Sequence, residues 1–302
     1  MSSMQTGQVA AVAAALLWTL STVAWALAGR RIGSLAVCFH RLLITSAFLV
    51  LYGGLVRHRW LPSDADGRTW LLLGLSGFMG FFLSDACSFK ALLLIGPRVT
   101  VLFQSLVPPL AALIAWQFLG ETLTVRHWAA MAVTLSGITW VILERRPAGA
   151  APAPRGHLAA GLLLALLGAM THAVAMVLSR QGMLGHYDAV AATFIRVIGA
   201  LPGYVILFTV LRHWPAAAAG LRHTRAMGIV VLGSVVGPFL GVIAYMVALE
   251  NCRAGVVATI LATMPVLVLP FAILLFREKV SFRAAAGAVI SVLGVALMCW
   301  ES

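Results

Sequence analysis

Two matching stretches decide the fold: residues 77–137 read GFMGFFLSDACSFKALLLIGPRVTVLFQSLVPPLAALIAWQFLGETLTVRHWAAMAVTLSG, and residues 234–294 read SVVGPFLGVIAYMVALENCRAGVVATILATMPVLVLPFAILLFREKVSFRAAAGAVISVLG. With an offset of 157 positions, Gly80 meets Gly237 and Pro108 meets Pro265. The same spacing pairs Ala91-Leu92 with Ala248-Leu249, Glu121 with Glu278, Arg126 with Arg283, and Gly137 with Gly294. The same chemistry at the same spacing, twice in one chain, indicates a duplicated unit.

The composition excludes a soluble protein. Of 302 residues, 62% are hydrophobic and 10% are charged, and the mean hydropathy is +1.00. A soluble domain cannot hide that much apolar surface, so the solvent is lipid. The net charge of +12 comes mainly from arginines between apolar runs, which suit anionic headgroups. Nucleic-acid binding would need positive charge clustered on one soluble face, and the sequence shows no such cluster.

A membrane-spanning helix needs about 20 mostly apolar residues. By that rule we predict ten spans: 8–28, 35–56, 70–94, 98–119, 126–143, 158–179, 188–211, 226–249, 254–276 and 283–300. The Pro/Gly/Ala-rich segment 144–157 is the one linker, so residues 1–143 and 158–302 form two five-helix repeats. We therefore expect an all-α, multi-pass protein of the inner (plasma) membrane.

An odd number of crossings has a geometric consequence. A five-helix unit ends on the opposite side of the membrane from its start, so its copy must be inverted, as in many secondary transporters. The arginine and lysine count of the loops favours an outward N-terminus under the positive-inside rule.

Prolines mark the same place in both repeats. Pro108-Pro109 and Pro265 with Pro270 lie inside apolar runs, where proline removes a backbone hydrogen bond and bends a helix. Matching bends beside polar residues indicate a binding site near the midplane. Gly233, Gly237 and Gly241 share one helical face, which indicates either a close helix contact or a face bordering the substrate path.

Ionisable residues inside the apolar runs are the strongest functional signal, because a charge at the bilayer centre is costly. Asp85 is the deepest, about fifteen residues into its run, and is the candidate for a substrate amine or a coupling proton. Arg41 and Arg196 either reach the headgroups or hold a substrate carboxylate. His172 is either a packed core residue or a proton relay. The candidate substrate-binding residues are Trp18, Thr22, Arg41, Ser84, Asp85, Ser88, Gln104, His172, Arg196, Tyr245, Thr259 and Thr263.

Several chemistries lack their motifs. The sequence has no phosphate-binding Gly-rich loop with Lys-Ser/Thr, no HExxH and no Gly-x-Ser-x-Gly. The four cysteines form no CxxC pair. We expect no catalytic residues, no cofactor and no metal.

These features resemble the EamA family of the drug/metabolite transporter superfamily. The residues that carry the resemblance are Gly120-Glu121, Leu123-Thr124, Gly137, Glu278, Val280-Ser281, Gly287, Gly294, the prolines Pro108 and Pro265, and the pairs Phe39-x-Arg41 and Phe194-x-Arg196. The chain departs from the family pattern in two ways. The second copy has Arg277 at the position that matches Gly120 of the first copy, and the first copy also carries Asp85 and Lys90. The resemblance implies ten helices in two inverted EamA-like repeats, with both termini cytoplasmic, which conflicts with the arginine count.

The function that we expect is secondary active export of small metabolites by alternating access. A carboxylate-binding arginine together with Asp85 suits amino acids or amino-acid-derived zwitterions, including opine metallophores. The alternatives are an integral-membrane enzyme, which would need acidic or histidine clusters at one membrane face, and a non-transporting scaffold, which leaves the matched prolines unexplained.

Overall fold

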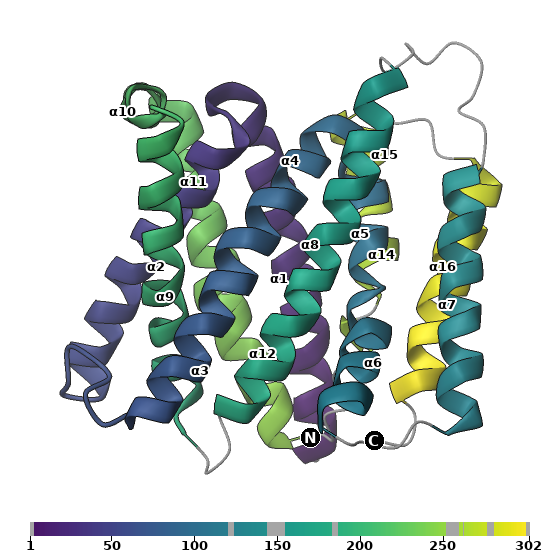
Figure 1. Ribbon diagram of the computed structural model, residues 1–302, viewed down its shortest axis with the longest axis horizontal. Coiled ribbons are helices and arrows are strands. Elements are labelled where there is room, and N and C mark those ends of the chain that lie inside the picture. The colour runs from purple at the N-terminus through teal and green to yellow at the C-terminus, as the bar shows by residue number, and fades with distance from the viewer. Residues whose placement is uncertain are drawn as a thin grey trace.

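The protein is a bundle of helices, and no strand occurs in the residues that the structure describes. The computed structural model describes residues 3–119, 124–143, 155–182, 187–251, 260–261, 263–276 and 281–299 (Figure 1). Within these residues seven helices are long and apolar enough to cross a membrane, and a shorter apolar helix covers Ala285–Leu297. The predicted all-α membrane architecture is confirmed.

Both predicted repeats consist of long helices joined by short connections. The helices before residue 144 are α1 (Ser3–Ile32), α2 (Ser34–Val56), α3 (Gly67–Gly77), η1 (Phe78–Ser84), α4 (Asp85–Ile95), α5 (Pro97–Gln104), α6 (Val107–Leu119) and α7 (Val125–Leu143). Those after residue 154 are α8 (Arg155–Gly182), α9 (Ala189–Val210), α10 (Trp214–Arg222), α11 (Thr224–Ser234), η2 (Val235–Gly241), α12 (Val242–Asn251), α14 (Met264–Leu267), α15 (Leu269–Phe276) and α16 (Phe282–Cys299). Helix α10 was not predicted, because its nine residues are too short for a membrane span.

Each repeat contains a π-helical turn at the same position. The turns η1 and η2 begin at Phe78 and Val235 and end at Ser84 and Gly241, so both ends differ by the 157 positions of the sequence offset. A π turn adds a residue to the helix and rotates every side chain that follows it, and such turns are frequent at functional sites. In the first repeat, the residue that directly follows the turn is Asp85.

The predicted bends are also matched. The fourth predicted span divides after Gln104, where Leu106 N–H donates to Phe103 O over 3.0 Å. In the second repeat, Thr263 N–H donates to Ile260 O over 3.1 Å. Pro108 and Pro265 therefore lie in the first turn of the helix that follows each break, where a missing N–H costs little.

The glycine face of the eighth predicted span contacts α1. A Cβ added at Gly233 would lie 2.6 Å from Trp25 Nε1, and one added at Gly241 would lie 2.5 Å from Trp18 Nε1. A Cβ added at Gly237 would lie 2.4 Å from Ser21 Oγ. The close-contact interpretation is confirmed: the glycines admit the two tryptophans of α1.

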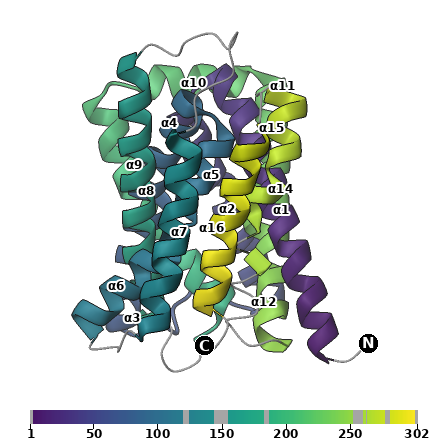
Figure 2. The same cartoon turned by 90° about the vertical axis from the view of Figure 1, so that its right-hand side faces the viewer.

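Helices α7 and α16 pack along each other (Figures 1 and 2). A Cβ at Gly137 would lie 2.5 Å from Ser291 N and 2.6 Å from Gly287 O, and one at Gly294 would lie 2.5 Å from Thr134 N and 2.9 Å from Ala130 O. Gly137, the later residue on α7, meets the earlier part of α16, and Gly294, the later residue on α16, meets the earlier part of α7. The two helices therefore run antiparallel. The matched glycines Gly137 and Gly294 thus make equivalent contacts with each other's helix.

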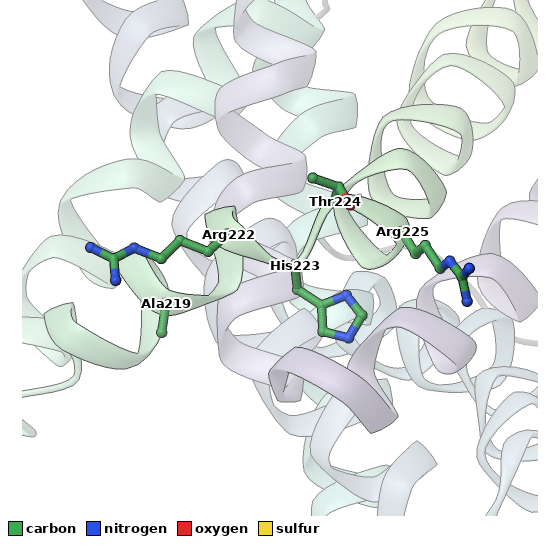
Figure 3. A pocket seen from close by; sticks show the side chains of 5 residues that line it. All are labelled: Ala219, Arg222, His223, Thr224 and Arg225. Carbon is green, nitrogen blue, oxygen red and sulfur yellow. The ribbon is translucent and has the colours of Figure 1, made fainter.

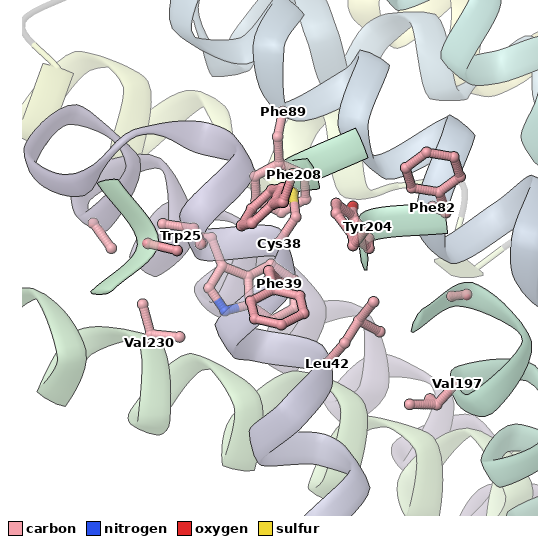
Figure 4. Packing of buried hydrophobic residues seen from close by; sticks show 14 of the residues in the cluster. Trp25, Cys38, Phe39, Leu42, Phe82, Phe89, Val197, Tyr204, Phe208 and Val230 are labelled. Atoms are coloured by element: carbon pink, nitrogen blue, oxygen red, sulfur yellow. The ribbon is translucent and has the colours of Figure 1, made fainter. Parts of the chain in front are cut away.

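An aromatic core joins α9 to the first repeat (Figure 4). The rings of Phe39 and Phe208 lie 5.1 Å apart, and those of Phe82 and Tyr204 lie 4.9 Å apart in an edge-to-face arrangement. In lipid, such packing replaces the hydrophobic effect as the source of helix association. This core positions α9 against η1.

One ionic cluster lies outside the spans and ties the connection after α2 to the start of α9. Arg57 Nη2 donates to Asp64 Oδ2 over 2.8 Å, and Arg57 Nε lies 3.6 Å from Asp188 Oδ1. Tyr187 donates its hydroxyl to Asp64 Oδ1 over 3.2 Å. Slight burial raises the pKa of Asp64, but its hydrogen bonds and the charge of Arg57 outweigh this and lower that pKa below its usual value.

The close contact between α7 and α16 predicts that adding one methyl group at Gly137 lowers the stability of the protein. In Gly137→Ala the new Cβ meets backbone atoms, which cannot rotate away, so we expect a loss of about 1–3 kcal/mol of stability. Thermal unfolding of the detergent-purified protein measures the change. Gly228→Ala is the matched control, because nothing lies within 4 Å of its added Cβ; equal melting temperatures for the two variants would contradict the packing.

Candidate functional site

The centre of the site is a buried ion pair between α2 and the start of α4. Arg41 donates through Nη2 to Asp85 Oδ2, and Arg41 is only 7% exposed. The alternative that Arg41 reaches the headgroups is therefore wrong: its guanidinium points into the bundle and is neutralised there. A buried pair of this kind must satisfy both charges locally, because each has lost its water.

Two aromatic rings enclose the guanidinium of Arg41. Its Cζ lies 4.5 Å from the centroid of the Trp25 ring and 5.3 Å from that of Phe89. Cation–π attraction at these distances offsets part of the cost of removing the cation from water. Sequence reasoning left out both rings as site residues, although Phe89 follows Asp85 by four positions on one helix and so shares its face.

Arg196 on α9 is the second cation inside the bundle. Its Cζ lies 4.6 Å from the centroid of the Phe81 ring, and its Nε is buried without a hydrogen-bond partner. The helix around Gly80 passes close to α8 and α9, since a Cβ added at Gly80 would lie 3.0 Å from Ala175 Cβ and 3.4 Å from Arg196 Nη2. Within the described part of the chain, Arg196 forms no ion pair.

The two repeats differ at the position that supplies Arg41 with its carboxylate. Arg41 and Arg196 both belong to the second helix of their repeat, in the matching Phe-x-Arg sequences. The position that matches Asp85, 157 residues further on, is Val242. Two cations and one carboxylate therefore occupy the interior of the described bundle.

Arg196 lies among other predicted site residues. It is within electrostatic range of Asp85, His172 and Tyr245. His172 Nδ1 lies 3.5 Å from Ser84 Oγ, which donates to Gly168 O over 2.8 Å. One carboxylate, one imidazole and one phenol, each from a different helix, are thus close enough to the Arg196 guanidinium to interact with its charge, although none forms a hydrogen bond or ion pair with it in the described residues.

The remaining predicted residues form smaller contacts. The ring centroids of Trp18 and Tyr245 lie 5.4 Å apart with the ring planes tilted by 43°, and Trp18 Nε1 donates to Gly237 O over 3.2 Å. Gln104 Nε2 donates to Ser88 Oγ over 3.1 Å. Thr22 and Thr263 donate to carbonyls of their own segments, at 2.9 Å and 2.6 Å, so nothing links either hydroxyl to the Arg196 cluster. Thr259 lies outside the described residues.

Two cavities in the described part of the chain lie away from the Arg196 cluster. A hollow of about 420 Å³ lies at the α10–α11 corner (Figure 3), and a crevice of about 10 Å³ lies beneath Leu49 and Phe194. Neither of these two cavities is lined by Arg196 or Asp85.

Comparison with known proteins places both predicted repeats in one family. The EamA-like transporter family matches residues 5–143 and, separately, residues 159–300. An uncharacterized transporter of Archaeoglobus fulgidus is 21% identical over 285 residues, covering 94% of this chain and 95% of the relative. A crystal structure titled only as that of a protein superposes with a TM-score of 0.60 at 22% identity, covering 97% of this chain and 96% of the other, which shows a shared fold.

The ion pair predicts a non-additive response to substitution. Arg41→Met and Asp85→Leu each leave an uncompensated buried charge, so each should lower stability by about 3–5 kcal/mol. The double variant Arg41→Met/Asp85→Leu removes both charges and should recover most of that loss. Thermal unfolding of all four proteins forms the cycle, and simple additivity of the two losses would contradict the pairing.

Proposed function

Because the chain belongs to the EamA-like transporter family, we propose that it is a secondary active transporter that exports small metabolites by alternating access. It would act as a non-enzymatic, multi-pass protein of the inner (plasma) membrane. The proposed architecture has ten membrane-spanning helices in two inverted five-helix repeats, residues 1–143 and 158–302, joined by the linker 144–157.

Three observations support the inverted arrangement. The equivalent helices α7 and α16 run antiparallel and meet at equivalent glycines. The π turns and the helix breaks recur at the same offset. The N- and C-terminal ends of the chain lie at the same end of the bundle (Figure 1), as expected for an even number of crossings. Two inverted copies around a central site can exchange conformations, which opens that site to each side in turn.

The observation that carries the proposal is the partly buried guanidinium of Arg196, whose Nε is buried without a hydrogen-bond partner and which forms no ion pair with a carboxylate of the described residues. A charge at mid-membrane costs at least about 2.5 kcal/mol, and charges that persist there mark substrate or ion pathways. Guanidinium binds carboxylates through two parallel hydrogen bonds, so a substrate carboxylate can supply the missing partner. The Phe81 ring would orient the guanidinium for this contact.

The pairing of Asp85 with Arg41 limits how a zwitterion can bind. Amino acids and amino-acid-derived zwitterions, including opine metallophores, remain the proposed substrates, with the carboxylate on Arg196. Their amine would compete with Arg41 for Asp85, or Asp85 would instead carry a coupling proton. In either case breaking the Arg41–Asp85 pair becomes a step of the cycle, and it would free α2 to move relative to α4.

Transport by Arg196 variants tests this proposal. Proteoliposomes loaded with a labelled amino-acid pool should lose label through the wild-type protein at least about tenfold faster than through Arg196→Gln, since a charge-assisted bond to a buried group contributes about 1.5–3 kcal/mol. Arg196→Lys keeps the charge but loses the two-pronged geometry, so we expect an intermediate rate.

The control variant is Arg59→Gln, an exposed arginine of the loop after α2. It should transport at the wild-type rate. Melting temperatures establish that each variant is folded. A folded Arg196→Gln protein that transports as fast as Arg59→Gln would overturn the assignment of Arg196.

A further inference from the structure

Helix α10 lies across the end of the bundle instead of along it. Figure 1 shows it nearly end-on above the upright helices, and Figure 2 shows it running across the top. Its buried face packs on the end of α1 and the start of α2: a Cβ at Gly220 would lie 3.6 Å from both Ile32 Cβ and His40 Cε1. Trp214 and Leu221 remain 40% and 56% exposed. A short helix in this orientation lies in the plane of the membrane surface, at the depth of the headgroups.

The surface around α10 is basic. Exposed arginines lie before the helix at Arg212, in its last turn at Arg222 and after it at Arg225, with His213 and His223 between them. Arg30 and Arg31 end α1 at the same end of the bundle. The described carboxylates lie elsewhere: Asp85 is inside the bundle, Asp64, Asp66 and Asp188 are at the opposite end, and Glu250 is in the last turn of α12.

The hollow of about 420 Å³ at the α10–α11 corner is lined by Ala219, Arg222, His223, Thr224 and Arg225. Figure 3 shows Arg222 and Arg225 extending to opposite sides of the corner, with the His223 ring between them. Side chains that diverge in this way cannot grip one phosphate together, but they can reach separate phosphates spread in a plane. We propose that the α10 corner, residues 212–225, is a docking surface for the headgroups of anionic phospholipids.

The physical basis is the surface charge of an anionic leaflet. Each arginine or lysine near such a surface contributes about 1 kcal/mol, or roughly fivefold in affinity, and the effect fades within a Debye length of about 10 Å. Exposed Trp214 and Leu221 add an apolar contact with the outer acyl region. Bound lipid would fix α10 against the membrane and with it the ends of α9 and α11, which are the helices that α10 connects.

Native mass spectrometry of the full-length protein tests this surface. The protein is extracted from nanodiscs made of equal parts phosphatidylglycerol and phosphatidylcholine, and the retained lipids are counted. We expect the wild-type protein to retain phosphatidylglycerol preferentially. Arg222→Gln/Arg225→Gln should reduce this preference on the order of tenfold, because two surface cations are removed.

The matched control is Arg59→Gln/Arg68→Gln, which removes the same charge from exposed positions at the opposite, mixed-charge end. It should keep the preference. The proposal is overturned if the α10 variant retains phosphatidylglycerol as the wild type does, or if the control loses as much. It is also overturned if millimolar inorganic phosphate displaces the lipid from the wild-type protein, because that would indicate a site for single phosphate ions.

Discussion

The structure depends on how three ionised side chains are kept inside an apolar bundle. Arg41 and Asp85 neutralise each other, and the rings of Trp25 and Phe89 enclose the guanidinium. Arg196 has only the Phe81 ring and more distant groups. Arginine suits both positions because its planar cation stacks on aromatic rings and is less strongly hydrated than an ammonium. In the described residues this leaves two cations and one carboxylate inside the bundle, and the proposed binding of a substrate carboxylate at Arg196 rests on that imbalance.

The imbalance is a difference between two otherwise similar repeats. The repeats share their π turns, their helix breaks and the glycines of α7 and α16, all at one sequence offset. They differ in charge, because Val242 stands where the first repeat has Asp85. A symmetric scaffold supplies two similar packing arrangements, and the asymmetric charge supplies a site within it. The first repeat contains the Arg41–Asp85 ion pair, and the second contains Arg196, which has no ion pair among the described residues.

The sequence was sufficient for most of the helices and for the repeat, because long apolar runs and matched prolines are local signals. It did not show which of the charged residues inside the apolar runs form ion pairs. Arg41 and Arg196 occupy similar positions in similar sequences, and the sequence alone does not show which of them Asp85 pairs with; the structure assigns that carboxylate to Arg41. The π turn before Asp85 has no recognisable sequence pattern. It nevertheless turns the Asp85 side chain to a different side of the helix from the one it would face in a regular α-helix. Helix α10 was missed because a nine-residue helix on the membrane surface has no transmembrane pattern.

A density map of the substrate-free protein in a lipid nanodisc tests the central claim most directly. The account predicts that Asp85 is in contact with Arg41 and that no carboxylate of the protein lies within an ion-pair distance, about 4 Å, of the Arg196 guanidinium. It also predicts that this guanidinium lies within the bundle, facing the centre shared by the two repeats. A map in which Arg196 is paired with a carboxylate of the chain, or extends to the headgroups, would contradict the account.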